Sequence, residues 1–183
     1  MKIGRLENYE DVPAFARDGY ELHDFQNGRR SVLVRCALDP IGFLSHVLNK
    51  AQGPVSLLYV LLLSRKDENA LGRYQSPYID VAEALHFLQR FREFLMSDAR
   101  HELWIHSPES LDVVYDRHER IWIYGDIDSI VGWVEGAGIP KEPLEPIPVP
   151  HSHHYHAEFD DDEDKVLGYW EWQRTPLRDA DGE

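Results

Sequence analysis

Hydrophobic residues between Ser76 and Gly138 recur with two different periods, and this stretch organises the rest of the chain. Its first part has apolar residues three and four positions apart, which predicts one long amphipathic helix that begins at Ser76-Pro77. The apolar positions are Val81, Ala84, Leu85, Leu88, Phe91 and Leu95. We expect this helix to lie across a sheet and to bury one face against it.

The segments that follow alternate between apolar and polar residues, which is the period of a half-buried strand. They are residues 102–107, 111–116 and 120–125. Short turn-forming sequences separate them, so the three strands are expected to pair as hairpins. Asp126 or Asp128 can cap a second helix, which ends at Gly136 or Gly138.

The preceding half of the chain predicts a hairpin, a helix and a buried strand. Asn27-Gly28 joins two strand-like runs and is a strong hairpin signal. The runs are residues 20–26 and 29–38. Asp39-Pro40 opens a helix, and the apolar run 55–63 predicts a central strand that is covered on both faces. The polar residues 65–75 are expected to form a loop.

Proline recurs every three residues after the second helix and predicts an extended surface connector over residues 140–150. The remaining residues, 151–183, contain two strand-like pieces joined by an acidic turn at 160–164. The pieces are residues 154–159 and 166–173. From about Arg178 the chain is expected to be disordered.

Three aromatic residues of this extension, Tyr169, Trp170 and Trp172, are too apolar for a free tail. We expect them to dock on the aromatic side of the predicted strands. That side carries Trp104, Trp122 and Tyr124. Because the strand at 120–125 is apolar on both faces, its second face requires cover from this tail or from another subunit. Both a monomer and a homodimer are compatible with this pattern.

Together these elements predict an α+β fold with a mostly antiparallel sheet, helices packed on one face, and a C-terminal hairpin docked on the domain. The predicted organisation is a single domain over residues 1–139, the connector over 140–150, and an acidic extension with His and Trp over 151–183.

Charge and composition narrow the classes of function. A formal net charge of -14 argues against nucleic acid as a partner and suits a basic protein. The longest apolar run is too short to cross a bilayer, and the N-terminus lacks the apolar core of a signal peptide. The single cysteine, Cys36, excludes an intrachain disulfide. These features predict a cytoplasmic protein without a membrane partner.

Hairpin geometry places His101 close to Asp116, and His118 lies in the turn at the same end of the predicted sheet. A histidine beside a carboxylate can act as a general base, so these three residues are the catalytic candidates. The alternative is that they are turn residues and members of surface ion pairs. The sequence contains no phosphate-binding glycine loop, nucleophile elbow or His-Glu-x-x-His helix.

Charged and aromatic residues near the same edge are candidates for contacts with a partner or ligand, since arginine can hold an anionic group and aromatic side chains can cover a partner. These candidates are Asp98, Arg100, Arg117, Trp122 and Tyr124.

The densest group of histidines lies between residues 151 and 156. On a strand, His154 and His156 point to the same side, a spacing that can bind zinc or nickel. The alternative is a solvated polar segment without a physiological metal. No cofactor is expected.

The segments 98–105, 114–118 and 121–125 resemble small acidic bacterial proteins, some of which are of the immunity type that neutralises a toxin and many of which have no assigned role. The resemblance covers residues 74–138 and consists of a hydrophobic pattern and a Tyr-Gly-Asp turn. The negative charge, the lack of a catalytic motif and the aromatic-rich C-terminal half favour a cytoplasmic protein-binding module that occludes a basic partner in the manner of an immunity protein. The competing hypothesis is a small hydrolase that uses the His/Asp cluster. A deep pocket at that cluster would favour the enzyme, and a flat acidic surface would favour the binding module.

Overall fold

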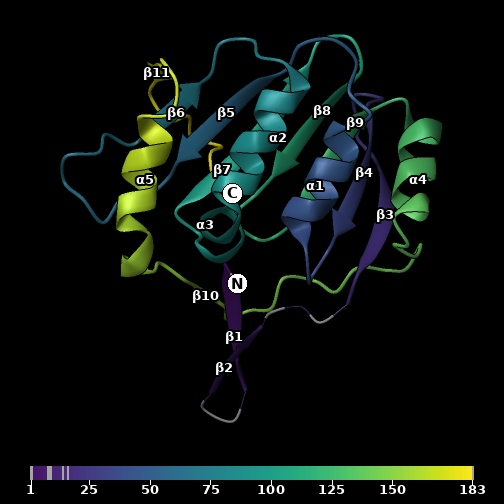
Figure 1. Cartoon of the computed structure of the whole chain (residues 1–183). Helices are drawn as coiled ribbons and strands as arrows, with labels where there is room; N and C mark the ends of the chain where they lie inside the picture. Colours follow the sequence, from purple (N-terminus) through teal and green to yellow (C-terminus); the bar gives the residue numbers. More distant parts are fainter. Residues whose placement is uncertain (1, 8–9, 14, 16, 183) are drawn as a thin grey trace.

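A large antiparallel sheet forms the centre of the protein, and the computed structural model confirms the predicted α+β fold (Figure 1). The structure describes residues 2–7, 10–13, 15 and 17–182. Within them, eight strands form this sheet and all neighbours are antiparallel. From one edge to the other, the strands are β11 (Gln173–Thr175), β6 (Gly72–Gln75), β5 (Ser56–Leu61), β7 (His101–Ser107), β8 (Leu111–Tyr115), β9 (Ile121–Gly125), β4 (Arg30–Arg35) and β3 (Gly19–Asp24).

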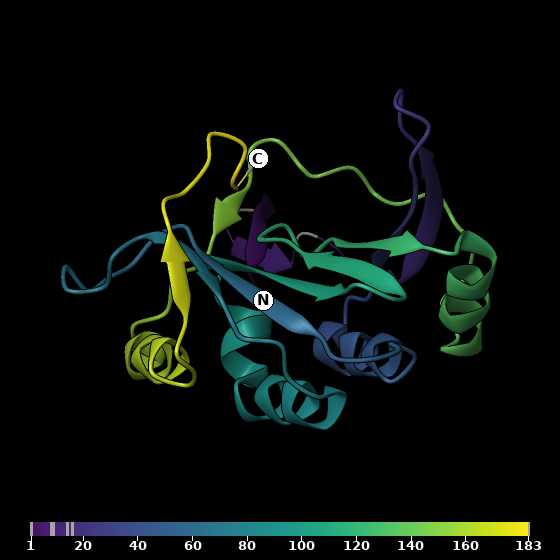
Figure 2. The same ribbon diagram turned by 90° about the horizontal axis from the view of Figure 1, so that it is seen from above.

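Helices cover one face of this sheet (Figure 2). They are α1 (Pro40–Leu48), α2 (Val81–Arg90), α3 (Arg92–Ser97) and α5 (Asp160–Leu167). A further helix, α4 (Ile127–Gly136), lies beside the sheet at its β3 edge and begins after Asp126, as predicted. In the described part of the chain, no helix combines the length and the apolar character needed to cross a membrane.

A second, smaller sheet lies at one end of the molecule. It is formed by β1 (Ile3–Glu7), β2 (Glu10–Pro13) and β10 (Ser152–His153). The connector 140–150 leads from α4 to β10 on the side of the large sheet opposite the helices (Figure 2). A short 3-10 helix, η1 (Ala157–Phe159), then leads into α5.

Strand order and burial confirm the expectation for the apolar run 55–63. Its strand, β5, lies between β6 and β7 inside the sheet. Leu57, Tyr59 and Leu61 are fully buried in the main core with the helices, and Val60 is fully buried on the opposite side. The strand is therefore covered on both faces along much of its length.

The turn signal at Asn27-Gly28 also forms as predicted. It joins β3 and β4, which pair from Gly19 with Arg35 to Asp24 with Arg30. Gly28 has a φ of 78°, a backbone conformation that glycine adopts at little cost.

The long helix predicted from Ser76 begins later and is interrupted. The Asp80 carboxylate accepts a hydrogen bond of 2.7 Å from Glu83 N, so α2 starts after Asp80. Ser76 is not a helix cap, because its hydroxyl accepts a hydrogen bond from Leu57 N at 2.9 Å and thereby extends the contact with β5. At Phe91 the backbone leaves the helical conformation, and α3 follows as a separate short helix.

The C-terminal extension does not form the predicted hairpin. The acidic run 160–164, expected as a turn, lies in α5, where negative charge near the helix N-terminus is favourable. The buried residues of this helix, Glu163 and Val166, are three positions apart, and one of them is charged. The spacing of apolar residues that predicts a helix therefore does not occur here, and the sequence pattern did not indicate α5.

The expectation of a loop over 65–75 was also wrong at the end of this segment, because β6 pairs there with both β5 and β11.

The end of the chain is not the disordered tail that was expected from Arg178. Residues 178–181 form a turn, in which Arg178 N donates a hydrogen bond of 2.7 Å to Asp181. The Asp181 carboxylate forms an ion pair with Arg73, and both side chains are more than nine-tenths buried.

The aromatic residues of the extension dock on the domain as expected, but on the helix side of the sheet. Trp170 stacks on Phe87 of α2 with ring centroids 4.7 Å apart. Tyr169 meets Phe91 edge to face at 5.5 Å, and Trp172 also contacts Phe87. These aromatic residues therefore cover the helices, and Trp104, Trp122 and Tyr124 on the opposite face need another explanation.

Replacing Leu61 by Asp is expected to prevent folding, because the variant would bury an unpaired carboxylate in the core. The matched control is Leu63→Asp, since Leu63 is 36% exposed at the end of the same apolar run. Circular dichroism should show a native spectrum for the control and not for Leu61→Asp. A soluble, native-like Leu61→Asp protein would contradict the interior position of β5.

Candidate functional site

One face of the large sheet carries no helix among the described residues, and side chains from four strands form an apolar row on it. Leu58 of β5 pairs with Trp104 of β7. Trp104 also pairs with Val114 of β8, which pairs with Trp122 of β9. Tyr124 lies two residues further along β9 and therefore on the same face. All five side chains are half-buried, and we call this group the open face.

A hollow of about 480 Å³ opens on the open face. Its lining includes Leu58, Trp104, Val114 and Tyr124 on the apolar side and Arg29, His106 and Asp112 on the polar side. His106 Nδ1 lies 2.5 Å from the Asp112 carboxylate. Burial raises the pKa of Tyr124, so its hydroxyl stays protonated at neutral pH. The hollow thus offers an apolar wall, a cation and a histidine–carboxylate pair.

Arginine side chains lie against the aromatic rings of the open face. The contacts are Arg73 over Trp104 at 4.8 Å, Arg29 over Tyr124 at 5.1 Å and Arg120 over Trp122 at 5.6 Å from the ring centroids. Such contacts are favourable because the ring faces carry negative potential. Arg73 pairs with Asp181, and Arg120 pairs with Asp116, so carboxylates balance both of these charges locally.

Of the catalytic candidates, His101 is part of the core. Its fully buried ring lies between Tyr59 and Phe94, with centroid distances of 5.1 and 4.7 Å. Neither ring nitrogen has a hydrogen-bond partner in the described part of the chain. Burial lowers the pKa of His101 well below its usual value, so the ring is neutral at neutral pH. It is not placed to exchange protons with a substrate.

Asp116 stabilises the turn between β8 and β9. Its Oδ1 accepts hydrogen bonds from the backbone N–H groups of His118 and Arg120 at 2.9 and 3.0 Å. Its Oδ2 accepts one from Arg120 Nε at 2.6 Å. Both carboxylate oxygens therefore serve the turn, and within the described part of the chain neither is bonded to a histidine ring. The geometry agrees with the alternative interpretation of these residues as turn formers.

Two of the binding candidates, Asp98 and Arg100, form a buried ion cluster. Arg100 Nε donates to Asp98 Oδ1 at 2.8 Å, and Arg100 Nη1 donates to Glu163 Oε2 at 2.7 Å. All three side chains have 0% exposure. The cluster joins the beginning of β7 to α5, so it is unavailable to a partner.

The histidines that the structure brings together are His118, His151 and His153. One nitrogen atom of each ring lies within 4.8 Å of the corresponding atoms of the other two. Burial lowers the pKa of His118 and of His153 to about 4, so both rings are neutral at neutral pH. His154 and His156, the sequence candidates for a metal, lie outside this group. Arg117, a ligand candidate, lies against the ring of His153.

Sequence reasoning found part of each site. The two-residue spacing that made His154 and His156 metal candidates also occurs at His151 and His153, so spacing alone could not decide between the two pairs. Nothing local associates His118 with them, because the path of the connector decides which chain segment reaches the β8–β9 turn. Leu58 and Val114 were likewise missed, since their place on the open face depends on the pairing of distant strands.

Comparison of the chain with protein-family models, curated proteins and solved structures finds no match. Its function must therefore be inferred from its own residues.

Replacing Arg100 by Met is expected to lower the free energy of unfolding by roughly 3–5 kcal/mol, because Asp98 and Glu163 would stay buried without a counter-charge. Urea unfolding followed by tryptophan fluorescence measures this effect. The control is Arg30→Met, which breaks an exposed pair with Asp24 and should cost less than about 1 kcal/mol. Similar losses in the two variants would contradict a structural role for the buried cluster.

Replacing His101 by Leu is expected to weaken the dependence of stability on pH. In the wild type the unfolded chain binds a proton at this ring below about pH 6.5, whereas the folded protein does not, so stability falls as the pH falls. Between about pH 7 and pH 5.5 this ring contributes a loss of stability, which the variant should lack. Urea titrations at both pH values would refute this if the two proteins lost stability equally.

Proposed function

We propose that this protein is a protein-binding module that contacts a basic partner through its open face. The observation that carries this proposal is the row of half-buried apolar side chains across four neighbouring strands. Neighbouring strands lie about 4.8 Å apart, so the row from Leu58 to Trp122 extends over roughly 14 Å. This extent suits the surface of another protein better than it suits a small molecule.

The chemistry of the open face supports a protein contact. Trp, Tyr and Arg are the residue types that most often dominate the energy of protein interfaces. Here Trp104, Trp122 and Tyr124 are held in place by strand pairing and by arginine side chains packed on their rings. A partner would therefore meet rings that lose little conformational freedom on binding.

The charge of the chain supports a basic partner. The formal net charge is -14, and two of the three arginines described at the open face, Arg73 and Arg120, are each paired with a carboxylate. The negative field of the whole protein would steer a basic partner and speed its association, and salt would screen this effect. The proposed role is inhibition by occlusion, in the manner of an immunity protein. We place this role in the cytoplasm, because a chain with a single cysteine suits a reducing compartment.

The alternative of a hydrolase that uses the cluster of His101, Asp116 and His118 has less support. A general base has to reach the proton that it removes. His101 is enclosed in the core, and both Asp116 oxygens bond to the turn.

Replacing Trp104 and Tyr124 together by Ala is expected to abolish capture of the partner while leaving the fold intact. The experiment compares proteins cross-linked to the wild type, to this variant and to Leu38→Ala in extracts of the source cell. Leu38 is 86% exposed and lies outside the open face, so Leu38→Ala should capture the same proteins as the wild type. Proteins lost only with the aromatic variant are then purified, and their affinity is measured at rising salt.

The proposal expects a basic partner whose affinity falls at least about tenfold with the aromatic variant, since interface aromatics often contribute more than 1.4 kcal/mol each. Its association rate should also fall with salt. Capture that is equal for all three baits, or a partner whose binding is insensitive to salt, would overturn the proposal.

A further inference from the structure

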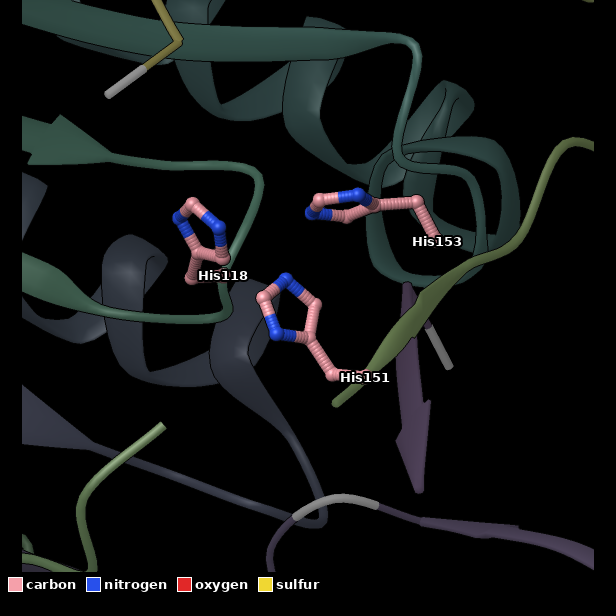
Figure 3. Close-up of side chains that lie close together, drawn as sticks. All are labelled: His118, His151 and His153. Carbon is pink, nitrogen blue, oxygen red and sulfur yellow. The ribbon is translucent and has the colours of Figure 1, made fainter. Parts of the chain in front are cut away.

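Three histidine side chains from distant parts of the chain meet at one end of the large sheet (Figure 3). His118 comes from the turn between β8 and β9, and His153 comes from β10. His151 directly follows the connector, two residues before His153. The ring centroids are 5.0 to 5.5 Å apart. The cluster therefore depends on the tertiary fold and not on a local sequence motif.

The rings present nitrogen atoms to a common space. Figure 3 shows a nitrogen atom of each ring turned toward the region between them. These three atoms lie within 4.8 Å of one another. Zinc–nitrogen bonds of 2.0–2.1 Å in a tetrahedral site require nitrogen atoms roughly 3.3 Å apart. Small rotations of two partly exposed rings would bring them to this spacing.

Hydrogen bonding leaves these rings with lone pairs to offer. No hydrogen bond to the ring of His118 is found among the described residues, so the ring nitrogen that faces His151 and His153 can carry a lone pair (Figure 3). His151 Nδ1 lies 2.8 Å from Pro148 O and can only donate to that carbonyl, which leaves Nε2 as the atom with a lone pair. Histidine ligands of metals are commonly held by a carbonyl in this way.

One neighbour opposes a cation. Arg117 lies against His153, with Nε 3.2 Å from Nε2 and Nη2 3.1 Å from Nδ1. A neutral imidazole has a single acceptor nitrogen, so only one of these contacts can be a true hydrogen bond. A metal on His153 would have to share the ring with this guanidinium or displace it. Arg117 should therefore weaken the binding of a dication, and removal of its charge should strengthen that binding.

We propose that His118, His151 and His153 form a binding site for a divalent transition metal, with zinc as the ion that fits best. Three imidazole nitrogen atoms favour zinc, copper or nickel over magnesium and calcium, which prefer oxygen ligands. Three protein ligands leave a fourth position for water or for a group from a partner. The bound ion would connect the end of the connector to the β8–β9 turn and so fix β10 against the domain.

The test measures zinc binding to the untagged, full-length protein by competition with a chromophoric chelator. The wild type should bind one Zn²⁺ with a Kd of about 10 µM or tighter. His151→Ala/His153→Ala should weaken binding at least about tenfold. The matched control is His154→Ala/His156→Ala, which removes two histidines from the same segment and should leave the affinity unchanged. Circular dichroism verifies that each variant is folded.

Two further variants distinguish a built site from a histidine-rich segment. His118→Ala should also weaken binding at least about tenfold, although this residue is distant in sequence. If it fails to fold, the two double variants still decide. Arg117→Gln should strengthen binding by roughly tenfold, because it removes a positive charge close to a dication. The absence of zinc binding, equal losses in both double variants, or unchanged affinity in folded His118→Ala would overturn the proposal.

Discussion

The buried guanidinium of Arg100 is the contact on which the arrangement of the C-terminal part depends. It bonds to Asp98 beside it in the sequence, to Glu163 on α5 and to the backbone oxygen of His156. Removing these charges from water is costly, and the cost is offset only because hydrogen bonds satisfy the guanidinium from several sides. The same bonds hold α5 close to the residues just before β7. A short acidic helix that would be unstable alone is thereby held on the domain.

This anchor explains how the acidic residues of the extension are used. Glu163 is fully buried, and it also accepts hydrogen bonds from Ser64 and Asn69. Asp164 binds Lys66 in the loop before β6. Once α5 is fixed, the chain returns past Phe87, where the aromatic residues of the extension pack, and β11 adds to the edge of the large sheet. Some of the acidic side chains are therefore used in hydrogen bonds and ion pairs within the fold. Only the other acidic side chains can attract a basic partner.

The sequence predicted the elements whose burial follows a simple period, and it failed where tertiary contacts override the period. The strands 102–107, 111–116 and 120–125 and the interior strand β5 follow from apolar patterning, and their structures confirm it. α5 was missed because its inward positions include Glu163, which is stable there only through Arg100. The open face could be predicted only in part, since alternation indicates Trp122 and Tyr124 but long-range register decides that Leu58 adjoins Trp104.

The connector relates the two proposed sites to each other. On its way from α4 to β10 it bonds to the β3–β4 side of the sheet, where Leu144 N donates to Glu21 and Arg35 donates to Glu145 O. These residues lie on the same side of the sheet as the open face. The connector leads directly into His151 and His153. An ion held there would anchor the end of the connector and restrict its movement over that side of the sheet.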